Sequence, residues 1–67
     1  MQGDTAVIAA AFEGYEDIVR ALIKAGANLN LMDAEGNTAF MLATLQGYTE
    51  VAKALTEAQV QEEVIYN

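Results

Sequence analysis

The sequence contains no cysteine and no histidine, and these two absences remove whole classes of function. Without cysteine the chain has no disulfide and no thiolate metal site, and without histidine it lacks the commonest metal ligand and general base. We therefore expect neither redox chemistry nor a zinc-dependent fold. No cofactor and no bound metal are predicted.

Basic residues are few, since three Lys and Arg stand against ten Asp and Glu, for a net charge of −7 at pH 7. Such a chain repels phosphate backbones and anionic lipids, so neither nucleic acid nor a membrane is an expected partner. The longest apolar run, Ala6 to Phe12, is far shorter than the ~20 residues of a membrane span. The first residues also lack the basic start of a signal peptide, and we expect an intracellular protein, cytoplasmic by default.

The most informative feature that is present is an internal repeat, because residues 3–25 are written again, in altered form, at 36–58. The identical pairs are Gly3/Gly36, Thr5/Thr38, Ala6/Ala39, Ala10/Ala43, Gly14/Gly47, Tyr15/Tyr48, Ala21/Ala54, Leu22/Leu55 and Ala25/Ala58. A period of 33 residues is typical of stacked helical units, whose functions lie on their surfaces. The repeat therefore favours a binding module.

Each copy predicts two short helices. Thr5 and Thr38 precede Ala-rich apolar stretches, where a threonine hydroxyl can cap a helix, so we expect the same backbone at both. Gly14 and Gly47 end these first helices. A second helix follows, and in the first copy its predicted apolar face consists of Ile18, Val19, Leu22 and Ile23. Glu16, Arg20 and Lys24 lie opposite, as a solvated row, and 27–37 is predicted to be an extended loop or tight hairpin.

No motif for catalysis or ion binding is present. The run from Asp33 to Asn37 has only a superficial likeness to a calcium loop, because its glycine comes too early and Thr44 stands where a bidentate Glu is needed. Glu13, Glu16 and Asp17 could pair as acid and base only in a pocket that separates their pKa values. A stack of two units has little interior for one, so we predict surface carboxylates and no enzyme.

Two stretches of the sequence resemble the ankyrin repeat family. Residues 36–51 are similar to that family's G-x-T-P-L-H-x-A-A-x-x-G-H-x-E-V pattern, and 22–33 to its L-L-x-x-G-A-D-V-N-x-x-D junction. The resemblance implies an all-α ankyrin-repeat solenoid: two helix-turn-helix repeats joined by a hairpin-like loop, with a C-terminal capping helix. It covers 3 to about 58, and we divide the single domain 1–67 into repeat one, 1–32, and repeat two with its cap, 33–67.

The sequence departs from the family pattern at two places. Ile8 and Met41 replace the family's His that cross-links neighbouring hairpins, and Tyr15 and Tyr48 replace its second His, so we expect both tyrosine rings to pack between helices. After Ala58 the family's Gly stop is missing. We therefore expect the last helix to continue with a polar outer face, with Val51, Leu55, Ala58 and Ile65 along one stripe.

The N-terminal end has no such polar cap, although Val7, Ile8 and Phe12 follow Gly3 closely. One apolar flank of the first unit is therefore expected to be uncovered. Stacks generally need about three units, so two readings stay open: a fragment of a longer array, or a chain that covers this flank by forming a homo-oligomer.

The resemblance also implies where a partner protein binds, since ankyrin partners touch the hairpin tips and the late part of each first helix. The matching positions predicted to bind the partner are Asp4, Phe12, Glu13, Met32, Glu35, Asn37, Leu45 and Gln46, with Gln2 and Ala34 beside them. Phe12, Leu45 and Met32 are predicted to form an apolar strip ringed by carboxylates, which would suit a basic or amphipathic protein segment. The alternative is that Phe12 and Leu45 are ordinary core residues.

Overall fold

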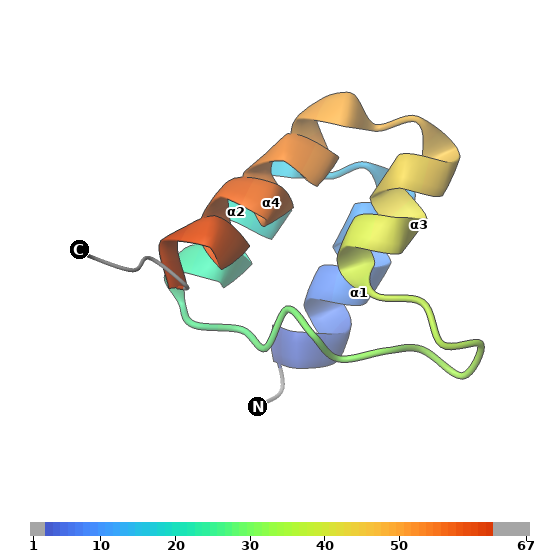
Figure 1. The fold of residues 1–67 in the computed structure, drawn as a ribbon, viewed down its shortest axis with the longest axis horizontal. Coiled ribbons are helices and arrows are strands. Elements are labelled where there is room, and N and C mark those ends of the chain that lie inside the picture. The colour runs from blue at the N-terminus through green and yellow to red at the C-terminus, as the bar shows by residue number, and fades with distance from the viewer. Residues whose placement is uncertain (1–2, 63–67) are drawn as a thin grey trace.

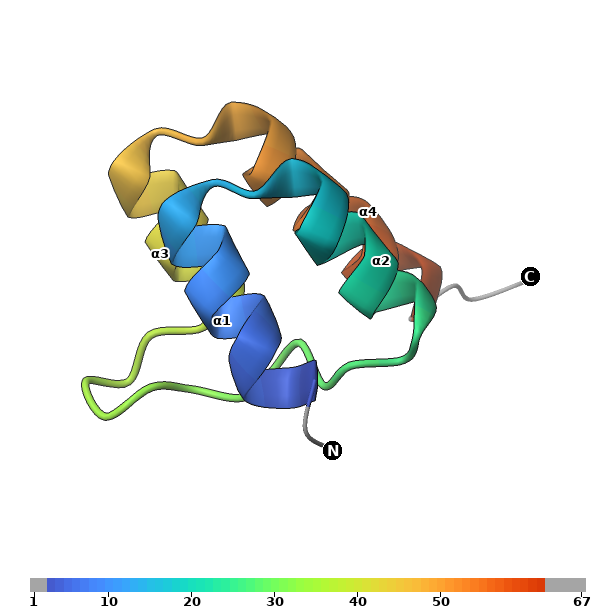
Figure 2. The same ribbon diagram turned by 180° about the vertical axis from the view of Figure 1, so that it is seen from behind.

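The computed structural model describes residues 3–62, and within this range the regular structure is entirely helical. The helices are α1 (Gly3–Glu13), α2 (Glu16–Lys24), α3 (Ala39–Gln46) and α4 (Thr49–Glu62). The antiparallel pair α1–α2 lies beside the antiparallel pair α3–α4, so that α1 contacts α3 and α2 contacts α4 (Figures 1 and 2). The predicted fold class, two stacked helix-turn-helix repeats joined by a loop, is confirmed.

The two repeats turn between their helices in the same way. Gly14 and Gly47 have φ values of 79° and 80°, in the left-handed region that only glycine enters without strain. The N–H groups of Tyr15 and Tyr48 then donate to the carbonyls of Ala10 and Ala43, both at 2.9 Å. These bonds satisfy carbonyls that the helix end leaves free, and they fix the direction in which the second helix starts.

The core lies between the repeats and is built from small side chains. Leu55, Val7, Val19 and Val51 are the largest side chains that are fully buried, and buried alanines of α1, α3 and α4, together with Ala27, fill the space between them. Alanine lets neighbouring helices approach closely, so four short helices can share one apolar core. The core therefore depends on the packing of repeat one against repeat two as well as on the packing within each repeat.

The first helix starts differently from the prediction. Thr38 has extended backbone, with φ −83° and ψ 169°, and its Oγ1 accepts a hydrogen bond from the N–H of Met41 at 3.3 Å. Thr5, in contrast, is already helical, because α1 begins at Gly3. The equal-backbone prediction is wrong at this pair. The loop 33–37 leads into Thr38 in an extended conformation, and nothing in the described part of the chain does the same for Thr5.

Two predictions about the outer side chains are also corrected. Ile18 is exposed rather than part of the apolar face of α2, whereas Val7 is buried against repeat two rather than on the bare flank. The Tyr48 ring lies over the Gly14 turn but remains 37% exposed, and Tyr15 is 54% exposed, so neither ring is enclosed between helices as predicted. The predicted continuation of the last helix past Ala58 is confirmed to Glu62, while Ile65 lies outside the described residues.

The two glycine turns offer a matched test of the packing between repeats. A Cβ on Gly14 would lie 2.9 Å from the Tyr48 ring, whereas a Cβ on Gly47 would meet nothing within 4 Å. Gly47→Ala should therefore cost only the left-handed strain of about 1–2 kcal/mol. Gly14→Ala should cost about 1 kcal/mol more, since the ring must move. Urea denaturation followed by circular dichroism measures both, and equal losses would contradict the Tyr48–Gly14 contact.

A second pair of variants tests the unequal helix starts. Thr38→Ala removes the cap of α3 and should lower the free energy of unfolding by about 1 kcal/mol. Thr5→Ala changes a residue inside α1 and should leave stability the same or slightly higher, because alanine is the better helix former. Thermal unfolding of the two variants compares them directly. A loss at Thr5 as large as that at Thr38 would show that both threonines cap.

Candidate functional site

The side chains of Phe12 and Leu45 project from the ends of α1 and α3 into solvent. Phe12 is 47% exposed and Leu45 is 74% exposed, so neither belongs to the core. The reason lies in the helical period: the buried side of α1 is formed by Val7, Ala10 and Ala11, and Phe12 falls on another side of that helix. The alternative in which both residues fill the gap between helices is therefore wrong.

The exposed apolar surface extends further along the two helices than the sequence indicated. Met41 precedes Leu45 by four residues and Ile8 precedes Phe12 by four, so each pair shares one helix face. Met41 is exposed and Ile8 is partly buried against the core. We call Ile8, Phe12, Met41 and Leu45 the inner strip. The i, i+4 spacing from Phe12 and Leu45 is the sequence signal that identifies Ile8 and Met41, which were not among the predicted binding residues.

The loop between the repeats projects as a hairpin from the end of the molecule where α1 and α3 begin (Figure 1). Asp33 holds it together, since its Oδ1 accepts from the N–H groups of Glu35 at 2.9 Å and Asn37 at 2.8 Å. The N–H of Asp33 also donates to the carbonyl of Asn37 at 2.9 Å. The Asp33 carboxylate is therefore the centre of a tight turn.

The predicted binding residues on this hairpin differ in accessibility. Met32 and Glu35 are exposed, whereas Asn37 is half-buried and its backbone is engaged with Asp33. Met32 and Leu45 lie at opposite ends of α3, which rises about 12 Å over its eight residues. Met41, in the first turn of α3, is also exposed and extends the apolar surface of Leu45 toward the start of that helix.

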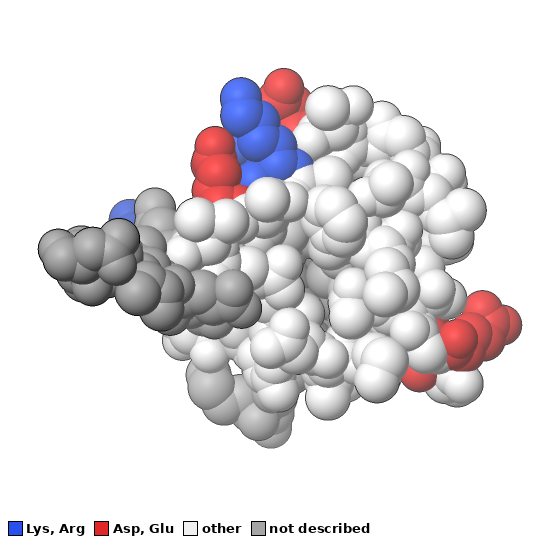
Figure 3. Space-filling view, viewed as in Figure 1, with Lys and Arg blue, Asp and Glu red and all other residues white. Residues whose placement is uncertain are grey.

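Acidic and polar groups stand at both ends of the inner strip. Glu13 and Gln46 are exposed beside Phe12 and Leu45, and Glu35 is exposed on the hairpin, where acidic side chains gather in Figure 3. Asp4 lies in the first turn of α1, and its side chain falls outside what the structure describes. The structure thus gathers Phe12, Glu13, Leu45 and Gln46 at one end of α1 and α3, and Met32 and Glu35 at the other.

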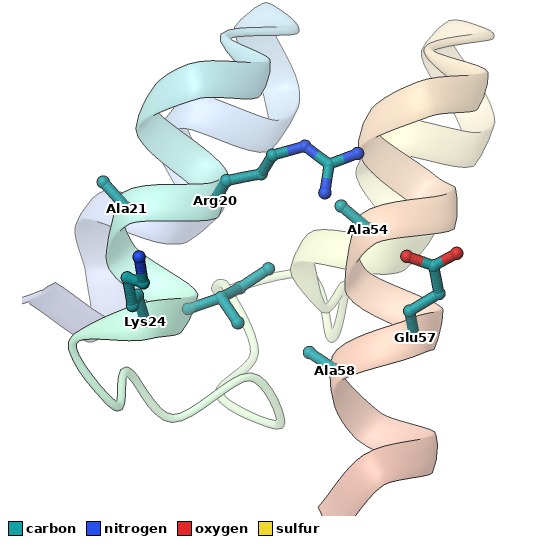
Figure 4. A pocket seen from close by; sticks show the side chains of 7 residues that line it. Arg20, Ala21, Lys24, Ala54, Glu57 and Ala58 are labelled. Carbon is teal, nitrogen blue, oxygen red and sulfur yellow. The ribbon is translucent and has the colours of Figure 1, made fainter.

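A hollow lies between α2 and α4. This groove of about 590 Å³ is floored by Ile23, Ala54 and Ala58 and flanked by Arg20, Lys24 and Glu57 (Figure 4). Arg20 Nε donates to Glu16 Oε2 at 2.9 Å, which is the main reason that the pKa of Arg20 is raised. The charges of Glu57 and Glu50 raise it further. Because Arg20 is already paired, the groove offers little for binding an anion.

Among the described residues, no three Asp or Glu side chains come together in a way that could hold a metal ion. None of the helices in the same part of the chain has the length and apolar character required to cross a bilayer.

Comparison with families of known proteins gives a match over most of the chain. The family model described as "Ankyrin repeats (3 copies)" matches residues 2–64. Neither the curated proteins nor the solved structures include a match to the chain.

The carboxylate of Asp33 makes the hairpin sensitive to acid. Its pKa is lowered, first by the backbone hydrogen bond from Asn37 and then by that from Glu35, so the ionised form favours the folded hairpin. This contribution is complete above about pH 3.9, the ordinary Asp value, and is lost as the pH falls through the lower folded pKa. In an NMR titration, the amide protons of Glu35 and Asn37 should shift with a midpoint below that value. Asp33→Asn should abolish the transition, and a midpoint at or above the ordinary value would contradict the turn.

Proposed function

We propose, from the premise that this chain belongs to the ankyrin repeat family, that its inner strip binds a segment of another protein. Ankyrin repeats are generally modules for protein–protein interaction and generally carry no catalysis. The remaining predicted contact residues are Asp4, Glu13, Met32, Glu35, Asn37 and Gln46.

The observation that carries this proposal is the repeated exposure of large apolar side chains on one side of α1 and α3. Phe12 and Leu45 occupy equivalent positions in the two repeats, and both are exposed although smaller or polar residues would be more soluble there. Clustered apolar groups with a polar rim are typical of the centre of a protein interface. Burial of these side chains by a partner would supply the binding energy.

The charge of the chain indicates the chemistry of the partner. Ten acidic residues against three basic ones create a negative field, and exposed carboxylates lie at both ends of the inner strip. A segment with basic residues beside an apolar face would therefore be attracted and then held by the strip. Because exposed charges are screened, this attraction should weaken as salt is added.

The test uses a synthetic amphipathic helical peptide of leucine and lysine as the probe. Phe12→Glu with Leu45→Glu should weaken its binding at least tenfold by isothermal calorimetry, since the apolar contact is removed. The two added carboxylates strengthen the attraction for lysine, so a loss reports the apolar contact alone. Ala25→Glu with Thr49→Glu adds the same charge at exposed positions outside the strip, where Thr49 is the equivalent of Glu16, and should bind as the unaltered chain does.

If the strip variant and its control bind the probe equally well, the inner strip is not the binding surface. Retention of the far-ultraviolet helical signal in both variants confirms that neither has unfolded. A leucine and glutamate peptide of the same length should not bind the unaltered chain, because its charge has the wrong sign.

A second candidate function is assembly through the flank of repeat one that faces away from repeat two. Ile18 on this flank is 49% exposed, whereas Val51, its equivalent in repeat two, is 2% exposed because repeat one covers it. The position is therefore buried in repeat two and exposed in repeat one, because repeat one has no neighbouring repeat on that side within the described residues. This observation favours a role in which another folded unit covers repeat one.

A further inference from the structure

Two surfaces meet between repeat one and repeat two, and an equivalent of each surface is exposed at one end of the stack. On the side that faces α1 and α2, repeat two buries Ala39, Leu42, Val51 and Ala54. The equivalent residues of repeat one are exposed: Ala6, Ala9, Ile18 and Ala21. We call this exposed set, together with Tyr15, the leading flank.

The other side of each repeat shows the reverse pattern. Repeat one buries Val7, Ala11, Val19 and Ala27 completely or nearly so. The equivalent residues of repeat two are more accessible: Phe40, Thr44, Ala52 and Val60. We call this second set, together with Gly47, the trailing flank. Inside the molecule a surface equivalent to the leading flank already packs on one equivalent to the trailing flank.

One contact shows how closely the two flanks match. The Tyr48 ring lies directly over Gly14, where even a Cβ would be only 2.9 Å from it. At the ends of the stack, the equivalent ring is uncovered, since Tyr15 is 54% exposed against 37% for Tyr48. The equivalent seat is also open, because a Cβ on Gly47 would meet nothing within 4 Å. The two glycine turns have the same glycine φ and the same hydrogen bond from the tyrosine N–H, so Tyr15 and Gly47 are carried on the same turn as the internal pair.

The trailing flank is suited to being covered. Helix α3 contains no charged residue, and the surface over it is uncharged in Figure 3, which looks at the repeat-two end of the stack. Thr56, next to this surface, donates its hydroxyl to the carbonyl of Ala52 at 2.9 Å. Burial of this surface would therefore not leave the hydroxyl without a hydrogen bond. Phe40 is larger than its equivalent Val7, while Ala9 on the leading flank is smaller than its equivalent Leu42.

Charge gives little help to such a contact. Inside the molecule Arg20 of repeat one lies near Glu50 and Glu57 of repeat two. If the trailing flank of one copy met the leading flank of another, Lys53 would take the place of Arg20. It would be attracted by Asp17, the equivalent of Glu50, and repelled by Lys24, the equivalent of Glu57. The net charge of −7 on each copy also opposes association. Apolar burial must therefore drive it, and added salt should strengthen it.

We infer that the occupant of the leading flank is the trailing flank of a second copy, with Tyr15 of one chain seated on Gly47 of the next. This inference rests on the second candidate function, in which the leading flank is a docking surface. Because the two flanks differ, the contact is heterologous, and a pair of copies leaves one leading flank and one trailing flank free. Copies add head to tail, and each added copy continues the stack of α1 and α3.

Two variants with one blocked flank each provide the experiment. Ala9→Lys with Ile18→Lys blocks the leading flank, and Thr44→Lys with Thr56→Lys blocks the trailing flank, all at exposed positions. In sedimentation velocity, the unaltered chain should grow with concentration beyond twice its 7.2 kDa mass. Each variant alone should stay monomeric, with at least tenfold weaker association. An equimolar mixture should form a dimer that grows no further, because one intact leading flank meets one intact trailing flank.

Other results would overturn the inference. If the trailing-flank variant dimerises alone, two leading flanks pair with each other, so docking on that flank stands but the head-to-tail contact is wrong. If the unaltered chain stays monomeric at millimolar concentration in high salt, both the inference and the assembly function are wrong. The peptide-binding proposal is tested separately. Should a lysine variant lose its helical signal, Tyr15→Ala replaces it, since this change removes only an exposed ring.

Discussion

The structure depends on the packing of one helix pair over the other. Neither pair could bury its apolar side alone, and the residues that are fully enclosed, such as Val7 and Val51, are enclosed because the other repeat covers them. The side chains in this core are mostly small, which lets the helices approach closely, and at the turn the absence of a side chain on Gly14 makes room for the Tyr48 ring. A short chain with such a core is expected to be only marginally stable, which makes every uncovered apolar flank significant.

The fold could be predicted because repeat spacing, glycine turns and apolar period all indicated the same stack. What the sequence could not supply was context. Thr5 and Thr38 are the same amino acid, but their backbones differ. Thr38 follows the hairpin loop, has extended backbone and caps α3, whereas Thr5 lies inside α1. Ile18 and Val51 are chemically alike, but only Val51 has a neighbouring repeat over it. Burial in a stack is set by position along the stack, which a pattern within one repeat does not contain.

The candidate site was predictable to a similar degree. Phe12 and Leu45 stood out as large apolar residues where the family is variable, and their exposure follows from the helical period. Met41 was missed because its position was interpreted as a lost hydrogen bond rather than as a gained apolar surface. Asn37 was included from the family position alone, although its backbone is tied to Asp33 at the base of the hairpin. Hydrogen bonds of this kind cannot be read from spacing.

The two proposed surfaces lie on different sides of the stack and are therefore compatible. The inner strip runs across α1 and α3 on one side, whereas the flanks are the ends of the stack, so a second copy on the leading flank would leave the strip open. Head-to-tail stacking would instead place the strips of successive copies in one line. A partner long enough to touch two strips would then favour the assembled state, and assembly would in turn raise the affinity for that partner. Linkage between the two surfaces thus follows from their arrangement, without any change of shape within a copy.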